Sequence, residues 1–206
     1  MLSSIAASLS AYVAAASLLT VTPGLDTALV LRTAASQSAR RAALTGLGIA
    51  AGCFGWAMLV AFGLGALLAA SELAYSILKW AGAAYLVWIG WSMLRHPRSE
   101  LIDRPVRQRS AFSTGLLTNL LNPKVGVFYV SFLPQFVPPH VEAAPYMLLL
   151  GAIHAGLGLI WFAALISATR PMARLLRRPA VVRWCDRVTG GVFVGFGIGL
   201  AIQRRA

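Results

Sequence analysis

Charged residues are scarce in this chain of 206 residues: only 12 % are Asp, Glu, Lys or Arg, and just six residues are acidic. A water-soluble domain has roughly a quarter charged residues. By contrast, 58 % of the residues are hydrophobic and the mean hydropathy is +0.73. Because so few polar side chains cannot cover this much apolar surface, the composition excludes the water-soluble classes of protein.

Cysteine is also rare, and the common signatures of enzymes are missing. Cys53 and Cys185 lie far apart, without the CxxC spacing of a metal site or a redox pair, and we expect both to be packing residues. The chain also lacks an HExxH sequence, a P-loop, a dinucleotide fingerprint and a Ser/His/Asp arrangement at useful spacing. The sequence therefore predicts no enzyme, no cofactor and no metal site.

Long apolar runs make up most of the chain. A helix needs about 20 largely apolar residues to cross a bilayer, and such runs lie at about 5–31, 42–70, 73–94, 111–137, 145–168 and 188–203. In lipid, backbone polar groups have to be satisfied inside helices. The predicted fold class is an all-α integral membrane protein with six transmembrane helices.

The net charge of +12 is concentrated in alternate connectors between these runs. The first, third and fifth connectors hold 14 of the 18 basic residues, whereas the other two hold Glu72 and Glu142 and no Lys or Arg. Basic residues in short loops mark the cytoplasmic side. The bias predicts an N-out, C-out topology rather than a nucleic-acid partner, although Arg204 and Arg205 would then lie outside. A five-span chain with a re-entrant segment is the alternative.

Two of the apolar runs are interrupted by proline, at Thr22-Pro23-Gly24 and at Asn122-Pro123-Lys124. Residues 82–85 also align weakly with residues 190–193, at a similar offset. We therefore expect a 3+3 inverted repeat in which helices one and four are broken. The single membrane domain, 1–206, then consists of one half over 1–94, a cytoplasmic basic linker over 95–110 and a second half over 111–206.

The breaks are candidate binding sites, because proline removes a helical hydrogen bond and clashes with the preceding turn. The freed groups at half-helix ends suit the charged ends of a small zwitterion; the alternative is a kink that serves packing alone. Asp26 and Lys124 lie within three residues of the breaks, and charges at membrane depth face a pathway or a partner.

Our hypothesis is one central cavity in which Asp26 binds a substrate ammonium or a proton, and Lys124 binds a carboxylate or pairs with Asp26. Alternatively, either charge reaches the membrane interface. The candidate substrate-binding or coupling residues are Thr22, Pro23, Gly24, Asp26, Thr27, Asn119, Asn122, Pro123, Lys124 and Gln135. For the Thr and Asn residues, capping or bonding between helices is the other interpretation.

Three further features receive structural interpretations. His154 is the only histidine well inside a run, and we expect a buried histidine satisfied by its neighbours rather than a proton relay. The spacings Gly48-xxx-Gly52 and Gly191-xxx-Gly195-xxx-Gly199 are predicted packing ridges, either within one chain or across a homodimer.

Four stretches carry a resemblance to a known family: TPGLDTALVL at 22–31, GAAYLVWIGW at 82–91, GLLTNLLNPK at 115–124 and FLPQF at 132–136. In this order they resemble the LysE/RhtB family of amino-acid exporters. The resemblance implies a secondary active exporter of amino acids or related small amines in the bacterial inner membrane, coupled to protons. Leu25 stands where the family motif has a second proline, and Trp56 where members often have histidine.

Two other function classes stay open. One is a channel or a transporter of another small solute, such as a metal ion or a quaternary amine; the scarcity of buried acids and of Met or Cys clusters argues against metals. The other is a membrane assembly factor or redox carrier, but the chain has no paired cysteines at the breaks.

Overall fold

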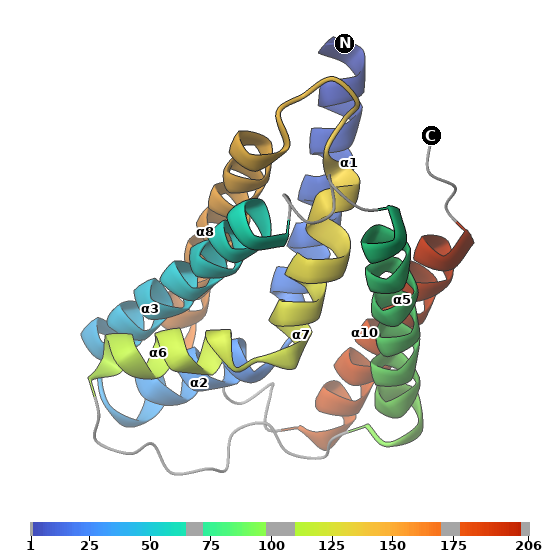
Figure 1. Ribbon diagram of the computed structural model, residues 1–206. Helices are drawn as coiled ribbons and strands as arrows, with labels where there is room; N and C mark the ends of the chain where they lie inside the picture. The colour runs from blue at the N-terminus through green and yellow to red at the C-terminus, as the bar shows by residue number, and fades with distance from the viewer. Residues whose placement is uncertain (1, 65–71, 98–109, 170–177, 203–206) are drawn as a thin grey trace.

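The computed structural model describes residues 2–64, 72–97, 110–169 and 178–202, and within these ranges the chain is helical without strands (Figure 1). This confirms the predicted all-α class. The elements are α1 (Leu2–Val21), α2 (Leu25–Ser36), α3 (Ala39–Met58), the π-helical η1 (Leu59–Leu64), α5 (Glu72–Arg95), α6 (Ala111–Leu120), α7 (Pro123–Val127), the π-helical η2 (Phe128–Phe132), the 3-10 turn η3 (Leu133–Phe136), α8 (Ala143–Ser167) and α10 (Pro179–Ile202).

Three helical stretches among the described residues are long and apolar enough to cross a membrane: Ser3–Val21, Ala39–Gly63 and Ala143–Ser167. They fall in the first, second and fifth apolar runs of the sequence. Most of the predicted linker over 95–110 lies outside the described residues, as do Arg204 and Arg205. The six-span arrangement and the division into two halves stay predictions.

Both prolines stand where one helix ends and the next begins. In the first apolar run α1 ends at Val21. The backbone of Gly24 is extended, and α2 begins at the next residue, Leu25. In the fourth run α6 ends at Leu120, and α7 begins at Pro123, directly after Asn122. Pro123 is the first residue of α7, a position that suits proline because the N–H that it lacks would have no helical partner there.

The helices form a larger group and a separate pair (Figure 1). In the larger group α3 packs against α2, α6 and α8, while α1 packs against α8. The pair consists of α5 and α10, and α5 approaches the larger group at α7 and η2. The two broken helices therefore belong to the larger group, beside α3 and α8.

Small residues bring α3 and α6 into close contact. A Cβ atom added at Gly48 would overlap the Phe112 carbonyl, and one added at Gly115 would overlap the Thr45 carbonyl. The ridge predicted at Gly48 thus packs within the chain. Because the two helix backbones nearly touch, α6 is held at a fixed position against α3.

The second predicted ridge is different. Gly191, Gly195 and Gly199 are exposed, and a Cβ atom at any of them would meet no other described atom within 4 Å. The glycines of α10 that pack against α5 are Gly190 and Gly197, where an added Cβ would lie 2.6 Å from the Gly90 carbonyl oxygen and 2.8 Å from the Ala83 carbonyl oxygen, respectively. The predicted ridge of Gly191, Gly195 and Gly199 therefore lies on a different face of α10 from the face that contacts α5.

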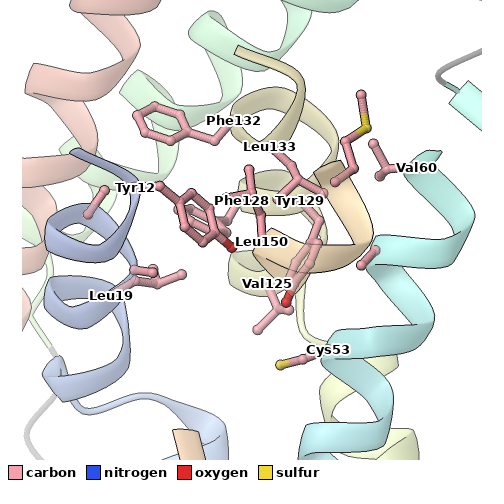
Figure 2. Packing of buried hydrophobic residues seen from close by; sticks show 14 of the residues in the cluster. Tyr12, Leu19, Cys53, Val60, Val125, Phe128, Tyr129, Phe132, Leu133 and Leu150 are labelled. Atoms are coloured by element: carbon pink, nitrogen blue, oxygen red, sulfur yellow. The ribbon is translucent and has the colours of Figure 1, made fainter. Parts of the chain in front are cut away.

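A buried aromatic and aliphatic cluster fixes the position of α7 and η2. Tyr129 and Leu133 are fully buried, and they pack with Tyr12 of α1 and Leu150 of α8. Figure 2 shows the η2 side chains between α1, which carries Tyr12, and the α3–η1 segment, which carries Cys53. This packing holds the start of α7 beside the end of α1.

Candidate functional site

The two breaks lie together and are joined by side chains. The Asp26 carboxylate, in the first turn of α2, accepts hydrogen bonds from the amide groups of Asn119 at 2.8 Å and Asn122 at 3.4 Å. Asn119 is in the last turn of α6, and Asn122 is the N-cap of α7. The acidic residue of the first break is therefore bound by the amides of the second.

Lys124 makes the corresponding contact in the other direction. Its ammonium group donates to the backbone carbonyls of Thr22 at 3.1 Å and Leu19 at 3.2 Å. These carbonyls lie at the C-terminal end of α1, which carries a partial negative charge. The basic residue of the second break is thus bound to the first, so each break holds the charged side chain of the other.

A cavity of about 50 Å³ opens beside these contacts. This is room for a few water-sized groups. Its wall comes from α1, α2, α3, α7 and α8, and consists of Leu19, Thr20, Thr22, Gly24, Asp26, Thr27, Ile49, Ala50, Cys53, Asn122, Lys124, Val125, His154, Ala155, Gly158 and Phe162.

The structure brings most of the predicted site residues together. Thr22, Gly24, Asp26, Thr27, Asn122 and Lys124 line the cavity. Asn119 is fully buried and holds Asp26 from outside the wall. Pro23 and Pro123 mark the two breaks. Gln135 is not part of the wall: its amide donates to the Ser131 carbonyl one turn earlier.

The hydroxyl groups of the two threonines make hydrogen bonds inside the protein. The Thr22 hydroxyl donates to the Leu18 carbonyl at 2.6 Å, so the Thr22 group that contacts the charged centre is its own carbonyl. The Thr27 hydroxyl accepts a hydrogen bond from the Trp161 indole at 3.4 Å. Both hydroxyls therefore have partners inside the protein.

Cys53 and His154 line the cavity, whereas the sequence predicted a packing role for Cys53 and a buried histidine satisfied by its neighbours at His154. The Asn119 amide that binds Asp26 also donates to the Cys53 sulfur at 3.3 Å. His154 is buried and shares a hydrogen bond of 2.9 Å with the Tyr129 hydroxyl, as expected of a satisfied histidine. The only sequence signal for their position was a polar or polarizable residue within an apolar run.

The two departures from the family pattern lie in different surroundings. Leu25 is half exposed at the start of α2. The Trp56 ring packs against α7, since a Cβ atom at Gly126 would come within 2.9 Å of it. Trp56 therefore fills the space beside the second break with a large apolar ring.

Together these features define a class of protein. A multi-pass helical membrane protein that encloses a charged cavity between two interrupted helices is typical of transporters. The comparison with known sequences gives the family: this chain belongs to the LysE type translocator family, whose sequence profile matches residues 17–204.

The relatives are similar over nearly their whole length. A threonine efflux protein of Escherichia coli strain K12 is 33% identical, covering 89% of this chain and 92% of the relative. A homoserine/homoserine lactone efflux protein of Salmonella typhi is 30% identical, covering 95% and 97%. An uncharacterized membrane protein of Vibrio cholerae is 32% identical, covering 94% and 96%. No solved structure matches the chain.

Proposed function

We propose that this protein is a secondary active exporter of amino acids or related small amines across the bacterial inner membrane, driven by the proton motive force. The observation that carries the proposal is the meeting of the two breaks at one cavity, with Asp26 and Lys124 in its wall. The relatives named as threonine and homoserine efflux proteins point to the same substrate class.

The cavity offers a group for each end of a zwitterion. The Asp26 carboxylate and the carbonyls at the end of α1 suit an ammonium group. The start of α2 suits a carboxylate, because its N-cap residue, Gly24, leaves the first N–H groups without a side-chain cap. The opposite ends of two half-helices thus face one small space, where both charges of an amino acid would be compensated.

The contacts also support an inverted repeat of two halves. If α1 to α5 form one half and α6 to α10 the other, the breaks match α1 with α6 and α2 with α7, and the helices that follow match α3 with α8 and α5 with α10. The last two of these pairs are in contact. Two halves related by a two-fold axis bring corresponding elements together in this way. Rocking of one half against the other around the cavity would then give alternating access.

Efflux from preloaded cells tests the function. Cells that overproduce the protein are loaded with threonine, homoserine and a panel of other amino acids, and the amount leaving the cells is compared with that from vector controls. We expect faster efflux of at least one amino acid, and its loss when a protonophore dissipates the proton gradient. Efflux that is undiminished by the protonophore excludes proton coupling, and no accelerated efflux of any amino acid excludes the substrate class.

A further inference from the structure

The sequence leaves one backbone oxygen at the first break without its helical partner. The Leu19 carbonyl of α1 would accept from the N–H of the residue four positions later, which is Pro23. Proline has no N–H. A buried carbonyl without a donor is costly, so this oxygen needs a donor from elsewhere in the molecule.

The second break meets the same requirement locally. Pro123 lies four residues after Asn119, but the Asn119 carbonyl accepts from the N–H of Asn122 at 3.0 Å, which tightens the last turn of α6. At the first break the donor to the Leu19 carbonyl comes from outside the helix. It is the Lys124 ammonium, which also binds the Thr22 carbonyl. The two breaks thus differ: the first contains a bound cation.

The ligands around this ammonium match what a primary amine needs. An ammonium group has three N–H donors and no acceptor, and two of the acceptors here are carbonyls at the negative end of a helix. The Asp26 carboxylate lines the same cavity. Lys124 reaches the site from α7, which is anchored by the buried Tyr129 and Leu133 that follow it.

We propose that the end of α1 is a binding site for a primary ammonium, that Lys124 occupies it in this structure, and that the ammonium of an exported substrate takes the same two carbonyls. Lys124 is then an internal competitor of the substrate. Two ammonium groups a few ångströms apart repel one another strongly inside a protein, so binding of the substrate displaces Lys124. This inference rests on the proposed function and names the group of the substrate that is recognised.

Displacement of Lys124 has a mechanical consequence. The contact between Lys124 and the end of α1 joins two elements more than 100 residues apart in the sequence. When a substrate ammonium replaces it, the first break no longer holds α7 by this contact. Substrate binding would therefore release one of the contacts that tie the two breaks together.

The first test compares the affinity of the Lys124→Met variant for the substrate with that of the wild type. This substitution keeps the length of the side chain and removes its N–H donors. If Lys124 competes with the substrate, the variant binds threonine or homoserine about tenfold more tightly than the wild type, although its efflux is slower. If Lys124 instead binds the substrate carboxylate, the variant binds more weakly, and the proposal is overturned. Equal affinity overturns it as well.

The second test does not depend on amino-acid transport. Lys124→Ala removes the side chain and leaves space for n-butylammonium, which reproduces the end of the lysine. We expect n-butylammonium to raise the thermal stability of purified Lys124→Ala in detergent. Tetramethylammonium has no N–H donor and should have no effect. The matched control is Lys79→Ala, since Lys79 is the other lysine of the chain, and n-butylammonium should not stabilise it.

The outcomes separate this inference from the proposed function. Stabilisation of Lys124→Ala by n-butylammonium alone supports the ammonium site, even if no amino acid is exported. Equal stabilisation by tetramethylammonium, or none by either cation, overturns the site, even if export is found. If Lys124→Ala unfolds on purification, it is purified with each cation present throughout; recovery of folded protein with n-butylammonium alone then supports the site, and recovery with neither overturns it.

Discussion

Two side-chain amides hold the Asp26 carboxylate, and they come from opposite sides of the α6–α7 break. Hydrogen bonds to a charged group contribute more than those between neutral groups. The hydrogen bonds from the amides of Asn119 and Asn122 therefore favour the charged form of the Asp26 carboxylate. Since Asp26 also lines the cavity, this single side chain connects the second break with the space for a ligand.

Removing the Asp26 charge is expected to slow export strongly. Asp26→Asn keeps the size of the side chain but removes the negative charge, so a substrate ammonium or a proton loses its partner. We expect efflux to fall by about tenfold or more, as for the loss of a charged hydrogen bond of ~1.5–3 kcal/mol. Efflux from preloaded cells is the measurement, and membrane levels of the variant are checked by immunoblot.

Glu142→Gln is the matched control for Asp26→Asn. It makes the same change of charge, but Glu142 is exposed at the start of α8 and its side chain makes no cap bond there. We expect wild-type efflux from this variant. Normal efflux from Asp26→Asn would show that the charge has no part in transport.

Asn119 is expected to contribute to stability as well as to the site. Its amide donates to both Asp26 and Cys53, and its side chain is fully buried. Asn119→Leu leaves the carboxylate without its shorter hydrogen bond, at a cost of about 1–3 kcal/mol. Thermal unfolding in detergent measures the loss. Leu117→Met, on the exposed face of the same helix, should leave the midpoint unchanged; a midpoint for Asn119→Leu equal to wild type would contradict this role.

At the scale of the elements, the site depends on how closely α3 and α6 approach. Gly48 of α3 and Gly115 of α6 each face a backbone carbonyl of the other helix. Asn119 lies further along the same side of α6, because an added Cβ at Gly52 would come within 2.6 Å of its side-chain oxygen. The glycines therefore set the position from which Asn119 reaches Asp26.

Enlarging Gly48 is expected to separate the two helices. In Gly48→Val the new side chain would overlap the Phe112 carbonyl, and relief requires a backbone shift. We expect a loss of about 1–3 kcal/mol in stability together with reduced efflux. The control is Gly156→Val in α8, where an added Cβ meets no other described atom within 4 Å. Equal stability of the two variants would show that the α3–α6 contact tolerates a larger side chain.

Over the whole molecule, the distribution of basic residues predicts how the chain lies in the membrane. Single cysteines are placed at Gln37, in the connector between α2 and α3, and at Glu142, before α8; both positions are exposed. The background carries Cys53→Ser and Cys185→Ser. In intact cells we expect a membrane-impermeant thiol reagent to label Glu142→Cys and not Gln37→Cys. The reverse labelling pattern would overturn the N-out, C-out topology.

At the scale of the whole molecule we also expect two copies of the chain to associate as a homodimer. Gly191, Gly195 and Gly199 stay available for contact with a second copy, because they do not face α5. Small residues at this spacing let membrane helices approach closely. The homodimer stays a prediction. Its test is disulfide trapping of Gly195→Cys in membranes, in the same cysteine-free background, where we expect a covalent dimer.

The sequence by itself determined the features that depend on local chemistry. The breaks at Pro23 and Pro123 follow from the missing N–H of proline, and the apolar composition predicted a helical membrane protein. The charges near the breaks, Asp26 and Lys124, were predicted to share a cavity because a charge in an apolar run needs a partner. They do line one cavity in the structure.

Only the tertiary structure decided which groups meet. The partners of Lys124 are carbonyls of α1 more than 100 residues away, and no pattern in the sequence pairs them. Likewise, the side of α10 that contacts α5 carries Gly190 and Gly197 rather than the regularly spaced Gly191, Gly195 and Gly199. The physical reason is that spacing along a helix defines its faces, whereas the neighbour of each face depends on how all the helices pack.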